Sequence, residues 1–235
     1  MAFDAADHNG HDHNGHGHDH NGHGHGHGHA NDQGLKAFVR YLRHAPSMWH
    51  SEINEAVVEL AAPTPGERGL DIGAGMGPGA VLAAGRGARV VAVEPTPFMR
   101  RILQGRRRLS RHGSRIEVSD GAAEQLPTRD KSIDVLWAVN TMHHCVDPDV
   151  AAGEIARVLK SGGRLVLVDE DFNHPDHPEH DKFGGADHGP EHHGFTMVDA
   201  GQMGDRLSAH GLVEVEAVER LLGDRPVIAV TASAP

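Results

Sequence analysis

The residues whose types and spacing could do chemistry begin with a glycine-rich loop after an acidic residue. Asp71 opens the loop, and an apolar helix-like run, residues 80–84, follows it. Glycine lets backbone N–H groups approach a ligand closely, and the N-terminus of a following helix favours an anionic group. A short strand, a glycine loop and a helix in this order predict a nucleotide-binding loop. The glycines stand at every second position, Gly73, Gly75, Gly77 and Gly79.

A second carboxylate, Glu94, ends the next apolar stretch. Residues 89–93 read Arg-Val-Val-Ala-Val, which predicts a buried strand. A carboxylate at the end of the second strand of a nucleotide-binding unit accepts hydrogen bonds from ribose hydroxyls. We therefore expect strands at about 68–72 and 89–93, joined in a right-handed crossover by a helix at 78–84.

Polar residues also follow two later strand-like segments, residues 132–139 and 164–168. Both segments are apolar on both faces, as central parallel strands are. Ligands bind at the carboxyl ends of such strands, and histidine or a carboxylate serves as a general base near neutral pH. For the histidines, hydrogen bonding at the start of a helix is an equal alternative. The catalytic candidates are His143, His144, Asp169 and Glu170, with Asp171 beside them.

Histidines are concentrated in two regions of the chain. Ten of the 22 lie within residues 8–29, and six lie within residues 174–193. The first region, with almost nothing apolar to bury, predicts a disordered tail over residues 1–34 with loose affinity for Ni²⁺, Zn²⁺ or Cu²⁺. Three prolines in residues 174–190 argue against a helix in the second region. Its candidate metal ligands are His174, His177, His180, His192 and His193, whose alternative role is hydrogen bonding in an exposed lid.

Composition limits the class of protein. The chain has 235 residues and a formal net charge of −11, which disfavours a nucleic-acid partner. The chain has one cysteine, Cys145, so it cannot form an internal disulfide. It contains no run of about 18 apolar residues, so we expect no membrane span. No secretory signal is visible. We expect a cytoplasmic protein with one α/β domain.

The remaining elements complete this domain, which we expect over residues 35–235. Residues 35–62 predict two helices, the second capped by Ser47, that either pack on the sheet or cover the ligand. Residues 171–196 form a histidine-rich lid or insert. Residues 198–207 predict a helix, and residues 212–232 a closing hairpin. A basic run from Arg100 to Arg111 is a solvated face or a contact for phosphates.

Several segments, in this order and spacing, resemble class I S-adenosylmethionine-dependent methyltransferases, in particular bacterial proteins with a type 11 methyltransferase domain. The resemblance implies one Rossmann-like seven-stranded sheet of order 3-2-1-4-5-7-6, with helices on both faces. It also implies S-adenosylmethionine as cofactor. The segments are residues 70–77, Glu94, and residues 123–127, 132–135 and 157–165.

The resemblance assigns roles to individual residues. The glycine loop would meet the methionine part of the cofactor, Asp71 its amino group and Glu94 its ribose. Many relatives have aspartate where this chain has Ala122, so Asp120 or a backbone carbonyl would contact the adenine instead. The implied cofactor-binding residues are Asp71, Gly73, Ala74, Gly75, Gly77, Glu94, Pro95, Met99, Gly121, Ala122, Ala123, Asn140 and Thr141.

These observations lead to one main hypothesis and two alternatives. The main hypothesis is a methyltransferase acting on a small-molecule acceptor, in which the donor is already activated and the protein supplies alignment and a base. The first alternative is a protein that stores or delivers Ni²⁺ or Zn²⁺; a divalent ion could also assist methyl transfer. The second alternative is a nicotinamide-dependent oxidoreductase. The position of Asp71 before the glycines argues against it.

Overall fold

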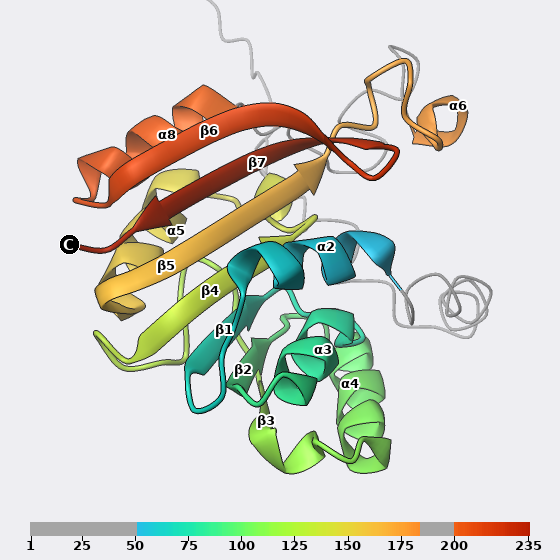
Figure 1. Cartoon of the computed structure of the whole chain (residues 1–235), viewed down its shortest axis with the longest axis vertical. Coiled ribbons are helices and arrows are strands. Elements are labelled where there is room, and N and C mark those ends of the chain that lie inside the picture. The colour runs from blue at the N-terminus through green and yellow to red at the C-terminus, as the bar shows by residue number, and fades with distance from the viewer. Residues whose placement is uncertain (1–50, 184–199) are drawn as a thin grey trace, which may run out of the picture.

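The computed structural model describes residues 51–183 and 200–235, which build a seven-stranded sheet. Its strand order is β3-β2-β1-β4-β5-β7-β6, as the resemblance implies (Figure 1). β7 runs antiparallel to both β5 and β6, and the other neighbouring strands are parallel. The strands are β1 Arg68–Ile72, β2 Arg89–Val93, β3 Ile116–Ser119, β4 Ile133–Val139, β5 Leu159–Glu170, β6 Val213–Leu222 and β7 Arg225–Ser233.

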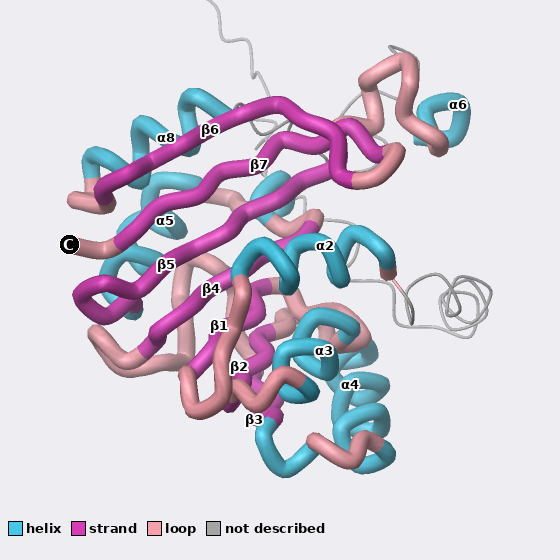
Figure 2. Tube along the Cα trace, viewed as in Figure 1, coloured by secondary structure: helices cyan, strands magenta, loops and turns pink. Residues whose placement is uncertain are grey.

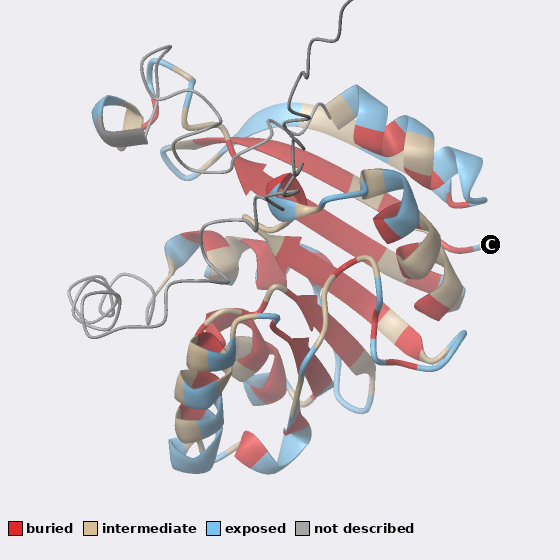
Figure 3. Cartoon of the chain, turned by 180° about the vertical axis from the view of Figure 1, so that it is seen from behind, coloured by how far each residue is buried: buried red, intermediate tan, exposed pale blue. Residues whose placement is uncertain are grey.

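Helices cover both faces of this sheet, as expected (Figure 2). One core joins α2, α3 and α4 to alternate residues of the strands, such as Val90 and Ala92 of β2. The other core joins α5 and α8 to the strand residues that point to the opposite face of the sheet, such as Val91 of β2. Seen from behind, α5 and α8 lie over the half of the sheet that holds β4 to β7 (Figure 3). The helices are α2 Glu52–Ala61, α3 Pro78–Gly85, α4 Pro97–Leu109, α5 Pro148–Val158, α6 His180–Phe183 and α8 Ala200–Ala209, with single 3₁₀ turns η1 Gly113–Arg115 and η2 Met142–His144.

Three sequence-based expectations about local structure are wrong. The N-cap of α2 is Ser51 rather than Ser47, and its hydroxyl accepts from Asn54 N at 3.4 Å. The strand expected over residues 164–168 begins earlier, at Leu159, and includes residues 161–163, because the Gly162 N–H donates to Ala234 O and the Ala234 N–H donates to Gly163 O. The short helix α6 forms in a region expected to be irregular.

α6 forms because it begins at His180, after Pro175 and Pro178, so neither proline removes a hydrogen bond from its interior. The expected tail over residues 1–34, the first N-terminal helix and residues 184–196 of the 171–196 insert lie outside the described residues. Among the described helices, none is both long enough and apolar enough to cross a bilayer.

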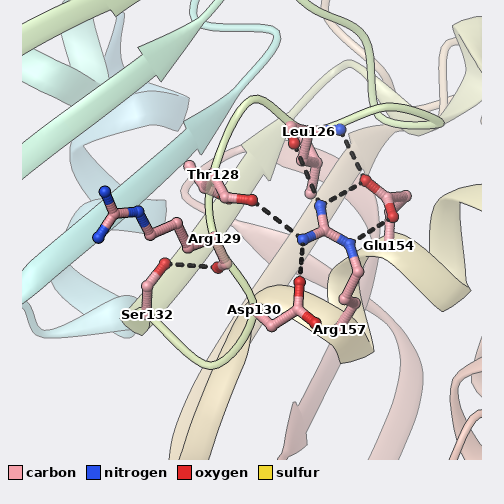
Figure 4. A network of polar contacts seen from close by, with 7 residues as sticks. All are labelled: Leu126, Thr128, Arg129, Asp130, Ser132, Glu154 and Arg157. Atoms are coloured by element: carbon pink, nitrogen blue, oxygen red, sulfur yellow. Dashed lines mark hydrogen bonds and ion pairs between the residues drawn. The ribbon is translucent and has the colours of Figure 1, made fainter.

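Arg157 of α5 holds the loop that links β3 to β4 (Figure 4). Its guanidinium donates to both carboxylate oxygens of Glu154, at 2.6 and 2.7 Å, and to Asp130 at 2.7 Å. It also donates to the backbone carbonyls of Thr128 and Leu126. One planar cation thus fixes a loop that has no helix of its own.

We predict that Arg157→Lys lowers the free energy of unfolding by about 1–2 kcal/mol, because an ammonium cannot reproduce five hydrogen bonds from a planar fork. Urea denaturation measures the difference. Arg129→Lys is the matched control, because Arg129 is exposed in the same loop and its side chain forms no hydrogen bond within residues 51–183 and 200–235. Equal stability of the two variants would contradict a fastening role for Arg157.

Candidate functional site

The glycine loop after β1 combines two tightly packed glycines with one that faces open space. Gly73, Gly75 and Gly77 all have positive φ, at 66°, 54° and 80°. A Cβ on Gly73 would lie 2.2 Å from Thr141 Oγ1, and one on Gly77 would lie 2.1 Å from Leu103 Cδ1. A Cβ on Gly75 would meet nothing within 4 Å. The backbone at Gly75 is therefore accessible to a ligand.

Glu94 follows β2 and is fixed beside this loop. Its carboxylate is buried, with 5% of the residue exposed. Oε2 accepts a hydrogen bond from Gly75 N and Oε1 accepts one from Thr96 N, both at 2.8 Å. Each oxygen keeps a second lone pair for an outside donor. Its expected neighbours differ in exposure, since Pro95 is exposed and Met99 is buried.

Asp71 is the least exposed carboxylate of the site, with 2% of the residue exposed. It pairs in register with Trp137 of β4, and neither its Oδ2 nor the Trp137 indole nitrogen has a hydrogen-bond partner in the described part of the chain. Burial raises the pKa of Asp71 to about 7, against the opposing effects of the nearby Trp137 and Ala80 N–H groups. Sequence reasoning missed Trp137, because a tryptophan within a buried strand reads as ordinary core.

The loop after β3 contains the residues expected to face adenine. Ala122 pairs with Gln125 in a small bridge, and Ala123 is buried in the core. Asp120 is exposed and already bound by Arg100, whose guanidinium donates to both of its oxygens at 2.7 and 3.0 Å. Sequence reasoning offered either Asp120 or a backbone carbonyl as the adenine contact. Asp120 is engaged in an ion pair, and a backbone carbonyl of this loop is not.

The residues after β4 are held against both neighbouring strands. Asn140 has φ +50°, a value that asparagine tolerates better than most residues. Its side-chain oxygen accepts from Glu170 N at 2.8 Å, and its amide nitrogen donates to Glu170 Oε2. The Thr141 hydroxyl lies 3.1 Å from Ile72 O, at the end of β1, and 3.0 Å from Val139 O.

Glu170 at the end of β5 links three further elements. Besides Asn140, its carboxylate accepts from Arg225 of β7 and lies 3.3 Å from His177 Nε2. His177 is itself buried and touches the ring of Phe172. Because donors occupy both oxygens, Glu170 is better suited to positioning than to proton abstraction. The Arg225 contact could not be foreseen, since the residue lies 55 positions away in the sequence.

His143 and Asp169 form a buried pair at the same edge of the sheet. His143 Nδ1 lies 2.6 Å from Asp169 Oδ1, and both side chains are 7% exposed. His144 is exposed and touches the ring of His143 at a centroid distance of 4.0 Å. Asp171 caps the next turn, where its carboxylate accepts from Asn173 N. The strand ends thus bring together the two expected catalytic residues that have the right geometry for a hydrogen-bonded dyad.

The candidate metal ligands do not meet around one point in the described residues. His174 Nδ1 accepts from Asp176 N, His177 contacts Glu170, and His180 Nδ1 lies 3.1 Å from Phe172 O. Over residues 51–183 and 200–235 there is no group of three side chains that could hold a metal ion. His192 and His193 lie outside the described residues.

Comparisons with known proteins place this geometry in a family. Residues 70–167 match the model of a family described as "Methyltransferase domain". Residues 70–167 therefore carry a methyltransferase domain, and the sheet around them has the fold of class I methyltransferases. Its sheet resembles that of phosphoethanolamine N-methyltransferase 2 from Haemonchus contortus, solved in complex with S-adenosyl-L-methionine. The TM-score is 0.66 at 17% identity, over 79% of this chain and 53% of the other.

Two curated relatives of the methyltransferase domain come from quinone biosynthesis. A demethylmenaquinone methyltransferase from Clavibacter sepedonicus is 37% identical over 114 residues, which are 48% of this chain and 45% of the relative. A ubiquinone/menaquinone biosynthesis C-methyltransferase from Rubrivivax gelatinosus is 36% identical over 112 residues, which are 48% and 43% of the two chains. The matched part therefore spans less than half the length of these relatives.

We predict that Asp71→Asn stabilises the ligand-free protein more at high pH than at low pH. The pKa of Asp71 rises on folding from 3.8 to about 7, so its contribution to stability is complete below pH 3.8 and is lost as pH rises through 7. Asparagine avoids this loss. Its advantage should grow by about 2–3 kcal/mol between pH 5 and pH 8.5. Urea denaturation at both pH values measures it.

Asp205→Asn is the matched control for this experiment, because Asp205 is exposed on α8 and has no partner among the described residues. Its effect should be small and independent of pH. An Asp71→Asn advantage that is equally small at both pH values would show that the carboxylate is not strained by burial.

Proposed function

We propose that this protein transfers the methyl group of S-adenosylmethionine to a small-molecule acceptor at the carboxyl edge of β1, β4 and β5. The observation that carries the proposal is a buried carboxylate, Asp71, whose Oδ2 has no hydrogen-bond partner among the described residues, at the start of a glycine loop whose backbone is open at Gly75. A buried anion without a partner is costly, and the cofactor's ammonium group would supply the missing partner. The family match at residues 70–167 supports the same reading.

The residues around the loop fit the other parts of the cofactor. Glu94 would accept hydrogen bonds from the ribose hydroxyls through the lone pairs that Gly75 and Thr96 leave unused. Gly73, Ala74 and Gly77 shape the loop. The carbonyls of the loop at Gly121, Ala122 and Ala123 would face the adenine, and Asn140 and Thr141 would border the carboxypropyl end.

When bound, the cofactor supplies a methyl group already activated by its positive sulfur, so the protein need only align the acceptor and manage its proton. We assign the proton transfer to His143. When Nδ1 carries the ring proton, it donates to Asp169 at 2.6 Å, and Nε2 is left as the basic nitrogen. His143 Nε2 would take the acceptor's proton, while the methyl group would leave the cofactor's sulfur as its bond to the acceptor atom formed.

The acceptor that suits this base is a small aromatic or enolic molecule that loses a proton from oxygen or from an activated carbon. Two observations support this class. The His143–Asp169 dyad is buried, which excludes water from the reacting atoms. Two curated relatives have names that refer to menaquinone or ubiquinone.

Glu94→Gln should weaken the binding of S-adenosylhomocysteine about tenfold or more, because an amide replaces the charged acceptor and offers an N–H to one ribose hydroxyl. Isothermal titration calorimetry measures the dissociation constant. Glu59→Gln, on the exposed surface of α2, is the matched control and should bind as the wild type does. Unchanged affinity in the Glu94 variant would overturn the cofactor assignment.

His143→Gln should lower kcat about 100-fold or more and leave the affinity for S-adenosylhomocysteine unchanged, because the base acts only on the acceptor proton. Methylated products of a panel of hydroquinones and phenols can be followed by mass spectrometry. His144→Gln is the control on the neighbouring exposed ring. If His143→Gln keeps the wild-type kcat with an acceptor that the wild type methylates, the dyad is not the base.

A further inference from the structure

A cleft lined by both charged and apolar residues lies at the edge of the sheet opposite the glycine loop. Its volume is about 720 Å³, within the range of small-ligand sites. Arg68 starts β1, Arg89 starts β2 and Arg115 immediately precedes β3, and all three line the cleft. Strands of five residues separate it from the site at the other end of β1 and β2, a distance of about 16 Å at 3.3 Å per residue.

Two arginines of this cleft stand opposite one another, and neither has a neutralising partner among the described residues. Arg68 and Arg89 are direct partners in the register of β1 and β2, and like charges placed opposite one another are destabilising. Within the described ranges, neither guanidinium makes a hydrogen bond or an ion pair. The cleft's other two arginines donate to carbonyls, Arg107 to Gly113 O and Arg115 to Ala84 O, which holds them in place and leaves their charge uncompensated.

The acidic groups nearby do not balance this charge. Glu117 lines the cleft but forms no ion pair in the described part of the chain. Asp134 accepts a hydrogen bond from Arg68 N at 2.8 Å, and its other oxygen accepts from Lys160 Nζ at 2.6 Å. Residues 97–116, which include α4 and η1, contain no aspartate or glutamate and seven arginines: Arg100, Arg101, Arg106, Arg107, Arg108, Arg111 and Arg115.

We propose that this cleft binds a small ligand bearing two or more phosphate groups. Guanidinium groups are planar forks that match phosphate oxygens in bidentate pairs. A multiply charged anion would relieve the repulsion between Arg68 and Arg89 and would bridge them to Arg107 and Arg115. The chain's net charge of −11 makes this concentration of cations local rather than general. The site is distinct from the methyltransferase site and does not depend on the proposed reaction.

Inorganic pyrophosphate is the probe for this site, measured by isothermal titration calorimetry on the full chain with sodium chloride at matched ionic strength. We expect saturable binding to the wild type that the double variant Arg68→Gln/Arg89→Gln weakens at least tenfold. Arg101→Gln/Arg108→Gln is the matched control, since it removes the same charge from exposed positions of α4 outside the cleft. Both variants should bind S-adenosylhomocysteine as the wild type does.

Vesicles of phosphatidylglycerol form a second arm that identifies the source of the phosphate. Sedimentation with these vesicles that needs Arg68 and Arg89, without binding of free pyrophosphate, overturns the small-ligand proposal and assigns the phosphates to a lipid surface. Binding of pyrophosphate alone assigns them to a soluble ligand. If both double variants lose the same amount of pyrophosphate affinity, the effect follows net charge rather than the cleft, and the proposal is overturned. The absence of saturable binding in both arms also overturns it.

Discussion

The burial of Asp71 beside Trp137 is the constraint on which the site depends. The two residues are register partners on β1 and β4, so the parallel pairing of these central strands fixes their distance. Gly79 completes the arrangement, because a Cβ there would lie 2.9 Å from both Asp71 Oδ2 and Trp137 Nε1. The last glycine of the loop is thus required by the carboxylate rather than by a turn. An ionisable group can be held in this way only by a rigid sheet, which supplies the energy that its desolvation costs.

A second set of contacts ties the outer strands to this centre. Glu170 at the end of β5 bonds Asn140 after β4, Arg225 at the start of β7 and His177 of the following segment. The left-handed backbone of Asn140 is held by two hydrogen bonds to the same residue. Any movement of the segment after β5 therefore reaches the residues that border the site. Such a shared carboxylate rigidifies a site when every donor is satisfied.

Sequence reasoning predicted the parts of this molecule that depend on local pattern. Apolar strands, the glycine loop and the carboxylates at strand ends follow from short-range periodicity and backbone chemistry, and the positions of Glu94, His143 and Asp169 at one edge follow from the parallel sheet. Long-range partners could not be predicted. Arg225 with Glu170, Trp137 with Asp71 and Arg100 with Asp120 are distant in sequence and are brought together by the strand order alone.

The continuous β5 strand was missed for a related reason. The segment 161–163 has the composition of a helix stop, but its backbone groups find partners at the C-terminal end of the chain, in Ala234. Tertiary hydrogen bonds thus outweigh local propensity at this point. The short helix α6 shows the same limit in the opposite direction, because the proline-rich composition of a region does not determine the conformation of the residues after its last proline.

The two ends of the sheet carry opposite charge, and this follows from a simple pattern in the strands. β1 runs from Arg68 to the carboxylate of Asp71, and β2 runs from Arg89 to Glu94 just beyond its end. Because the strands are parallel, each such sequence adds a cation to one edge and an anion to the other. A cationic sulfonium donor suits the acidic edge, and a phosphate-bearing ligand suits the basic one. The same parallel pairing would thus serve both the proposed cofactor site and the proposed anion site at its opposite end.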